Sequence, residues 1–219
     1  MKTGLNRRFF SYLAAALVLG GLYAAPGYAQ EEGADALVKR LSTEVLDAIK
    51  ADKSIQSGDT FKVVSLVETK VLPHLNFERM TASAVGPNWR QATPEQRKRL
   101  QEEFKTLLVR TYSGALTQVS DQTISVKPLR AAADDKEVLV RTEVKGRGDP
   151  IQLDYRLEKM VTGSGSSAGS GWKIYNINVL GVWLVETYKT QFAAEINAKG
   201  LDGLITSLAE RNKSNAKKG

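Results

Sequence analysis

The sequence of 219 residues contains no cysteine and a single histidine. Without cysteine there is no thiol nucleophile, no thiolate metal ligand and no disulfide, so a folded domain must be held by its core. His74 alone cannot supply the several His or Cys ligands that a zinc site usually needs. A Ser-His-Asp triad could use it, but the sequence has no Gly-x-Ser-x-Gly elbow. Its place after Pro73 is more typical of a surface or capping residue.

Other catalytic patterns are scarce as well. Asp154 and Glu158 share the polar face of a predicted strand with Arg156, as in a solvated ladder of alternating charge. No glycine-rich phosphate loop precedes a helix, and the glycines of Gly146-Arg147-Gly148 fit a hairpin turn. The composition argues against an enzyme. One alternative stays open, a small enzyme on a cone-shaped α+β fold with a buried carboxylate such as Asp154 as base.

Long hydrophobic segments are limited to the first residues. The run from Phe9 to Leu22 is short for a bilayer span of about 20 residues. It follows the positive charges of Lys2, Arg7 and Arg8 and precedes small residues up to Ala29, which is the organisation of a secretory signal. We predict cleavage after Ala29 and export across a bacterial inner membrane.

The net charge of +7 is concentrated at the two ends of the chain. Residues 1–29 hold three basic residues and 211–219 hold four, which leaves 24 basic and 24 acidic residues between them. A neutral body is a poor nucleic-acid binder. We predict a cleaved signal peptide at 1–29, one domain at 30–210 that is large enough for a substantial core, and a basic disordered tail at 211–219.

Helical spacing of apolar residues dominates both ends of the predicted domain. Asn76 is a good N-cap for a short helix that ends at Gly86, and Thr93-Pro94-Glu95-Gln96 is a strong start signal for a long helix. The expected helical segments are 37–49, 60–71, 77–85, 94–119, 184–196 and 201–208.

Apolar and polar residues alternate in the middle of the chain, as in half-buried strands. The expected strands are 122–127, 138–145, 151–158 and 172–179, and the Gly/Ser stretch 163–171 reads as a flexible hairpin loop. The pattern predicts an α+β domain in which an antiparallel sheet of about four strands has amphipathic helices packed on one face. Several such helices on one modest sheet leave two readings open, an ordinary core or a lining for an apolar ligand.

Five stretches of the sequence carry a resemblance that covers nearly all of the chain after residue 29. The last of them is the most specific, because a strand, a glycine and an aromatic helix ending Tyr-basic-x-Gln-Phe are hard to match by chance. The stretches are Lys70–Pro73 with Asn76–Met80; Ala84–Thr93; Glu95–Leu116 with Gln96, Phe104 and Tyr112; Gly148–Ile151 leading to Tyr155; and Trp172–Ile177 through Leu180–Val182 to Tyr188–Phe192. The sequence thereby resembles the MlaC, or toluene-tolerance, family of periplasmic phospholipid-binding carriers.

Four positions depart from the family pattern. Asn76 and Asn176 stand where we expect Asp, and Lys189 replaces the more usual Arg. Trp183 stands where a small residue such as Ser is expected, and its bulk would alter the shape of a pocket that it lined.

The resemblance implies a non-catalytic carrier with phospholipid as its cargo and no cofactor. Such proteins shuttle phospholipid through the periplasm between an outer-membrane lipoprotein–porin complex and an inner-membrane ABC transporter, which maintains outer-membrane lipid asymmetry. They bury the acyl tails in an apolar cavity between helices and sheet. An envelope protein-interaction module remains the main alternative, and it would have a solid core with an exposed apolar patch.

Patterning and resemblance together nominate candidate site residues. Arg147 and Lys189 are candidates for contact with a headgroup phosphate. The candidate lining residues for lipid tails are Val71, Met80, Leu107, Leu108, Leu153, Tyr155, Leu180, Trp183, Leu184, Tyr188 and Phe192. The sequence leaves five properties open: the headgroup preference, the number of tails, the direction of transport, the docking surfaces and the oligomeric state.

Overall fold

The computed structural model describes residues 32–132, 134–160 and 171–216. The predicted signal peptide with cleavage after Ala29 lies outside these ranges, as does most of the Gly/Ser stretch. Contacts divide the chain into Met1–Gln30 and Glu31–Gly219, and everything below concerns the second unit.

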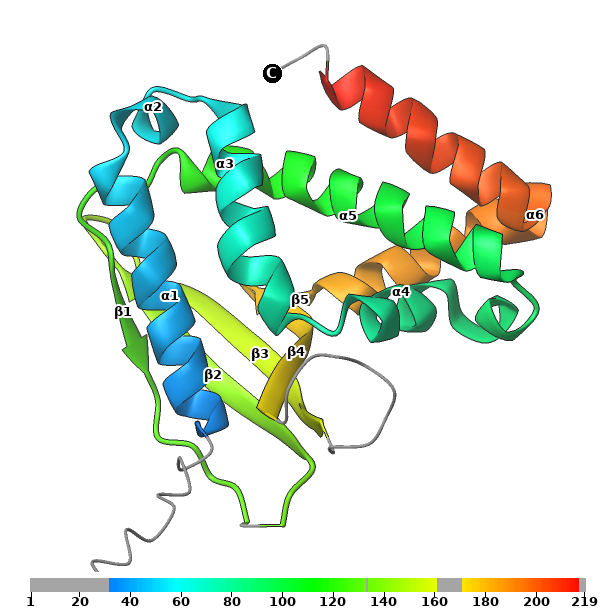
Figure 1. Ribbon diagram of the computed structural model, residues 1–219. Coiled ribbons are helices and arrows are strands. Elements are labelled where there is room, and N and C mark those ends of the chain that lie inside the picture. The colour runs from blue at the N-terminus through cyan, green and yellow to red at the C-terminus, as the bar shows by residue number, and fades with distance from the viewer. Residues whose placement is uncertain (1–31, 133, 161–170, 217–219) are drawn as a thin grey trace, which may run out of the picture. The chain divides into compact units, whose positions relative to one another are not determined.

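Helices occupy both ends of this unit and strands its middle, as the hydrophobic periods predict (Figure 1). A π-helical turn over Val67–Val71 and 3₁₀ turns over Leu72–His74 and Gly86–Arg90 connect the first helices. The helices are α1 (Ala34–Ala51), α2 (Lys53–Gln56), α3 (Thr60–Leu66), α4 (Phe77–Val85), α5 (Pro94–Leu116) and α6 (Leu184–Ala216). The strands are β1 (Thr123–Val126), β2 (Glu137–Lys145), β3 (Ile151–Met160), β4 (Gly171–Val179) and β5 (Val182–Trp183).

The predicted helix starts are confirmed at the atomic level. The Thr93 hydroxyl accepts a hydrogen bond from the backbone N–H of Gln96, whose side chain accepts one from the backbone N–H of Thr93. This capping box fixes the start of α5. The Asn76 side chain accepts from the backbone N–H of Arg79 at the start of α4, and that helix ends at Gly86 with φ 70°. The long helix ends at Leu116, three residues before the predicted limit.

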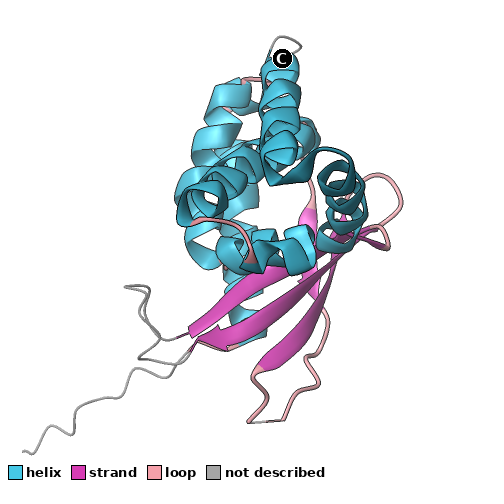
Figure 2. Cartoon of the chain, turned by 90° about the vertical axis from the view of Figure 1, so that its right-hand side faces the viewer, coloured by secondary structure: helices cyan, strands magenta, loops and turns pink. Residues whose placement is uncertain are grey.

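The sheet is antiparallel, as expected, but it has five strands in the order β1-β2-β3-β4-β5. The predicted number of about four is corrected by β5, a two-residue strand that pairs Val182 with Val179. A tight turn makes this pairing possible, with Leu180 at φ 51° and Gly181 at φ 87°. Figure 2 shows most of the helices gathered on one side of the strands.

Side chains of opposite character cover the two sides of the sheet. Facing residues in the register place Val140, Tyr155 and Ile177 on one side, which carries α1. Their neighbours Arg141, Asp154 and Asn178 therefore lie on the other side, because successive side chains in a strand alternate. The apolar side, which carries α1, is called here the helix-facing side, and the polar side contacts the first turns of α4 and α6 through ion pairs.

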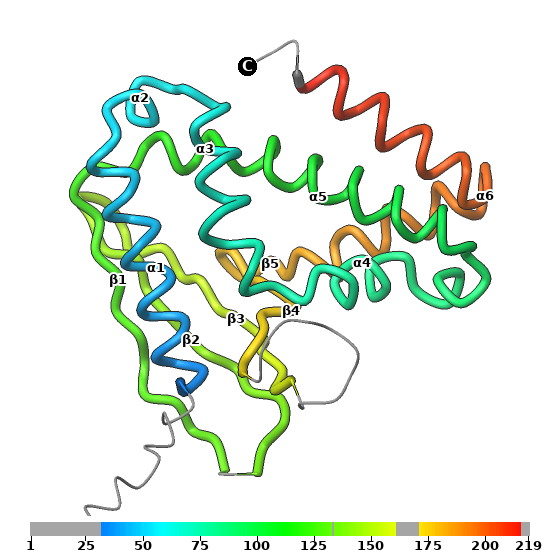
Figure 3. The backbone as a smooth tube through the Cα atoms, in the orientation of Figure 1, coloured from blue at the N-terminus to red at the C-terminus, as the bar shows by residue number. Residues whose placement is uncertain are grey.

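The core consists of three apolar clusters. The largest joins α4, α5 and α6, and it includes Phe104 and Phe192, which are at most 1% exposed. A second lies between α1 and the sheet, and the third lies among the end of α1, α2 and α3. Figure 3 follows α1 across the sheet and α5 beside α6, two arrangements that the helix contacts support. A domain of this size more often has one contiguous core.

The predicted disordered tail at 211–219 begins too early. After a break at Gly200, with φ 69°, helix α6 continues to Ala216. Asn212 is buried, with its side-chain amide donating to the backbone carbonyl and the carboxylate of Glu103, and Arg211 pairs with Glu195. These contacts with α5 and with the first part of α6 hold the basic segment, and residues 217–219 lie outside the described part.

Candidate functional site

The helix-facing side of the sheet changes from buried to accessible along its strands. At one end, Leu157 and Ile174 pair in the register and are 0% and 1% exposed beneath α1. Toward the other end, Leu153 pairs with Val179, and both are only half-buried. At the last position of the same side, Ile151 is 42% exposed. An apolar strand surface that stays accessible forgoes the stabilisation of burial.

Tyr155 lies between these two ends, and its environment combines two features. Burial raises the pKa of its phenol above the ordinary value, opposed by hydrogen bonds with the hydroxyls of Ser42 on α1 and Thr142 on β2. Part of the side chain nevertheless remains accessible. The accessible part of the helix-facing side therefore extends from Ile151 through Leu153 to Tyr155.

Half-buried apolar residues from the helices border the same region. Val45 on α1 packs against both the cluster under α1 and the cluster around α3, and Leu75 joins the first of these to the α4–α6 cluster. We give the name apolar seam to a set of half-buried apolar residues that lie on the margins of the three clusters and on the accessible end of β3 and β4. Its members are Val45, Val67, Leu75, Leu108, Leu116, Val119, Leu153, Tyr155, Ile177 and Val179.

The structure separates the nominated lining residues into several groups. One group is sealed within the α4–α6 cluster, where Phe104 packs edge-on against two aromatic rings. Its members are Met80, Leu107, Tyr188 and Phe192. Leu184, at the start of α6, is also buried. Another group is half-buried: Leu108, Leu153 and Tyr155 belong to the apolar seam, and Val71 ends the π-helical turn.

Two further nominated residues lie at the β4–β5 turn, outside the apolar seam. Leu180 is 65% exposed. Trp183 pairs with Asn178 and therefore lies on the polar side of the sheet, with the Arg156 guanidinium 4.0 Å from its ring centroid. In this position the Trp183 ring stacks with a cation on the side opposite Tyr155.

The two nominated cations lie on different elements of the fold. Arg147 is in the β2–β3 turn, where its guanidinium lies 3.1 Å from the Asp121 carboxylate and its side chain is 90% exposed. Lys189 is exposed in α6, close to Gly86. Both charges are therefore exposed to solvent.

The polar side of the sheet carries ion pairs. Arg79 binds the carboxylates of Glu137 and Glu158 at 2.7 and 2.5 Å and stacks on Tyr175. The hydrogen bond from Arg79 holds the pKa of Glu137 below its ordinary value. Because Glu158 also accepts from the Asn76 side chain, this network fastens the start of α4 to three strands.

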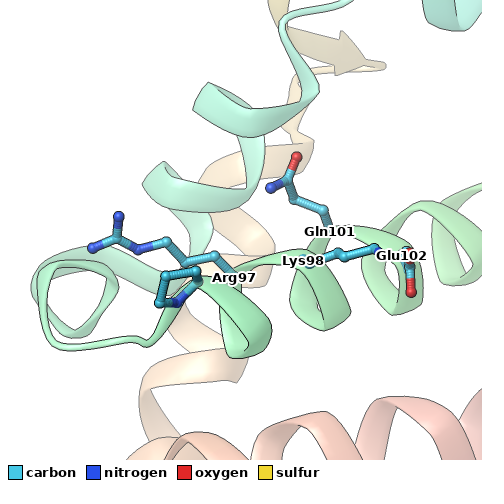
Figure 4. A pocket seen from close by; sticks show the side chains of 5 residues that line it. Arg97, Lys98, Gln101 and Glu102 are labelled. Carbon is cyan, nitrogen blue, oxygen red and sulfur yellow. The ribbon is translucent and has the colours of Figure 1, made fainter.

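Asp154 departs from the expected solvated ladder, because it is buried on the polar side. Its Oδ2 accepts from the Gln152 amide at 2.7 Å, and its Oδ1 has no partner. The enzyme alternative requires this carboxylate in a closed pocket, whereas the hollow in Figure 4 lies on α5. Within the described residues, no cluster of three or more His, Cys, Asp or Glu could hold a metal.

That hollow is an open depression on the outer surface of the first turns of α5. Figure 4 shows Arg97, Lys98, Gln101 and Glu102 around it, beside Pro94. Charged, solvated side chains of this kind do not suit an apolar ligand. The apolar seam is therefore the candidate site.

Of the ten members of the apolar seam, the sequence nominates only Leu108, Leu153 and Tyr155 as lining residues. Val45 and Val67 had been placed on apolar helix faces, and Leu116 and Val119 extend the face of α5. Periodicity shows that such residues turn inward, but buried and half-buried positions have the same spacing. No local signal distinguishes them.

Comparison with known proteins identifies the class. A sequence profile described as "MlaC protein" matches residues 39–210, and the chain belongs to this family. It is 25% identical to the intermembrane phospholipid transport system binding protein MlaC of Haemophilus influenzae (80% of this chain and 79% of that protein). It is 29% identical to the toluene tolerance protein ttg2D of Pseudomonas putida (76% and 74%).

A solved structure supports the fold at higher identity. The phospholipid-binding protein from Ralstonia solanacearum, in complex with a phospholipid, is 48% identical and superposes with a TM-score of 0.77, covering 84% of this chain and 98% of that one. Within the described residues, no helix is both long and apolar enough to cross a membrane.

Proposed function

We propose that this protein is a phospholipid-binding transport protein whose apolar seam holds acyl chains. The observation that carries the proposal is the graded exposure of the helix-facing side of β3 and β4, from sealed Leu157 to half-buried Leu153. Acyl chains placed there would bury apolar surface of both partners at about 0.8 kcal/mol per CH₂. The phospholipid complex of the Ralstonia solanacearum relative supports the same cargo.

The proposed pathway follows the family. The protein would be exported to the periplasm and would exchange phospholipid with an outer-membrane lipoprotein–porin complex and an inner-membrane ABC transporter, thereby maintaining outer-membrane lipid asymmetry. Such a carrier needs no catalytic group, because a lipid crosses water without any bond being made. Arg147 and Lys189 remain proposed headgroup contacts, and their exposure allows them to meet a phosphate that stays in solvent.

A test combines native purification with two matched substitutions. Leu153→Asp places a carboxylate on the seam, whereas Leu139→Asp places the same group on the polar side, where Leu139 faces Arg156. Both leucines are half-buried on neighbouring strands. A carboxylate among acyl chains is strongly disfavoured, so Leu153→Asp should lose bound lipid and Leu139→Asp should keep it.

The readout is mass spectrometry of an organic extract from detergent-free protein. Near-stoichiometric phospholipid in the wild type and in Leu139→Asp, with little in Leu153→Asp, is the expected result. An empty extract from folded wild-type protein, or equal lipid in both variants, would refute the seam as the cargo site. Circular dichroism of each variant checks that the fold is retained.

A further inference from the structure

Five large apolar side chains of the described residues are exposed, and three of them lie at one place. Ile151, Leu180 and Val182 are 42%, 65% and 51% exposed. The backbone N–H of Leu180 donates to the carbonyl of Gln152, and Val182 pairs with Val179, so the three residues lie at the same end of the sheet, where β3 begins and β4 turns into β5. We call them the apolar tip.

The apolar tip is continuous with the apolar seam. Val182 pairs with Val179 and Ile151 with Val144, and both pairs lie on the helix-facing side. Along β3, exposure falls from Ile151 through half-buried Leu153 to sealed Leu157. The tip is therefore the outer edge of the surface on which the proposed cargo lies.

The backbone of the tip is strained in a way that stability alone does not explain. Leu180 has φ 51°, and it is the one residue other than glycine with positive φ in the described part of the chain. A bulky side chain in this region is uncommon, and Asn or Gly is preferred before the glycine of such a turn. Leu180 therefore has both an unfavourable backbone conformation and an exposed apolar side chain. This combination points to contact of the side chain with an apolar partner.

The chemistry around the tip selects the occupant. Residues 150–153 and 179–183 contain no charged side chain, so the tip itself carries no charge that would have to leave water on insertion. The exposed side chains are aliphatic, whereas protein interfaces are enriched in aromatic residues and arginine. Behind the tip, Trp183 stacks with Arg156, and tryptophan is enriched at the headgroup level of membranes.

We propose that the apolar tip enters the interfacial region of a phospholipid bilayer, so that the seam opens directly onto membrane lipid. This inference rests on the proposed function, and it adds direct exchange with membrane lipid to the exchange with the two complexes. A lipid that enters past the tip keeps its tails against apolar surface throughout, and the small area of the tip lets the loaded protein leave again.

The test uses vesicles of phosphatidylethanolamine and phosphatidylglycerol with the mature protein. The double variant Leu180→Asn with Val182→Thr removes the apolar groups but keeps the fold, because Asn-Gly is the favoured turn sequence and Thr is β-branched like Val. The matched control is Phe61→Ser on α3, which removes a side chain that is 87% exposed. Vesicle flotation should show binding by the double variant weakened at least about tenfold, with the control near wild type.

A second measurement separates this inference from the proposed function. Binding of monomeric dihexanoyl-phosphatidylcholine needs the seam but no bilayer, so the double variant should retain it. Three results would each overturn the tip as a membrane contact: unchanged flotation of the double variant, an equal loss of flotation in Phe61→Ser, or loss of dihexanoyl-phosphatidylcholine binding by the double variant. Unchanged flotation would instead assign the apolar tip to contact with a protein partner. If wild-type protein binds no phospholipid in either form, the proposed function itself fails.

Discussion

Two leucines on the same side of β3 provide the sharpest test of whether the apolar side of the sheet is sealed at one end and accessible to a ligand at the other. Leu157 is 0% exposed beneath α1, and Leu153, four residues earlier on the same face, is half-buried. Replacing either by alanine removes about three carbon groups, worth about 2.4 kcal/mol of transfer free energy if the site is fully buried. The two sites differ in what surrounds the missing atoms.

Leu157→Ala leaves a sealed void, which adds a cavity term, so we expect a loss of about 3–4 kcal/mol in the free energy of unfolding. At Leu153 water already reaches part of the side chain, and we expect a loss of about 1 kcal/mol for lipid-free protein. For a domain of this size these losses correspond to melting temperatures lower by about 10 °C and about 3 °C.

The loss of phospholipid affinity should be larger for Leu153→Ala than for Leu157→Ala, which is the opposite of the order expected for stability. Leu153→Ala removes a contact with the proposed cargo, so its phospholipid affinity should fall by about tenfold, while Leu157→Ala should bind normally once folded. Urea unfolding of delipidated protein measures the loss of stability. Lipid titration followed by melting measures the phospholipid affinity, because a ligand that binds only the folded state raises its stability. Equal destabilisation by both variants, or full affinity in Leu153→Ala, would refute the seam.

Three further outcomes follow from local geometry. Thr93→Ala removes the hydroxyl that caps the Gln96 N–H and should cost about 1 kcal/mol of unfolding free energy in urea; a neutral result would mean that Gln96 alone suffices. Arg79 lowers the pKa of Glu137 from 4.5, so this pair stabilises above about pH 4.5 and the benefit is lost as the pH falls through the folded-state pKa. Urea midpoints at pH 7 and pH 3 should therefore differ less in Arg79→Met than in wild type, and an equal difference would contradict the assignment. Gly200→Ala forces a Cβ into φ 69° and should lower the melting temperature by a few degrees, with an unchanged melt excluding strain there.

Much of the architecture could be predicted because its signals are local. The capping box at Thr93 and the N-cap at Asn76 each involve residues three apart. The alternation around Tyr155 identified a half-buried strand and the correct apolar side of it. The failures concern β5, which has only two residues and so no measurable period, and the segment at Asn212, whose charge suggested solvent while its amide binds Glu103 on another helix.

The candidate site was predicted only in part, for a reason visible in α5. Leu107 and Leu108 are neighbours, both apolar and both nominated, yet the first is sealed and the second is half-buried. The difference comes from the residues of other elements that cover each one. Trp183 illustrates the same point, because the β4–β5 turn sets which side of the sheet it occupies.

By itself the sequence determined the class of fold, the apolar side of each strand, the main helix boundaries and, through motifs spread along the chain, the MlaC family. The helix boundaries depend on hydrogen bonds between residues a few positions apart, and the fold class and the apolar sides depend on short hydrophobic periods. Only the tertiary structure decided which apolar side chains are sealed and which remain accessible along the seam and at the tip. Burial is a property of surfaces that meet from distant parts of the chain, and no local pattern records how closely they approach.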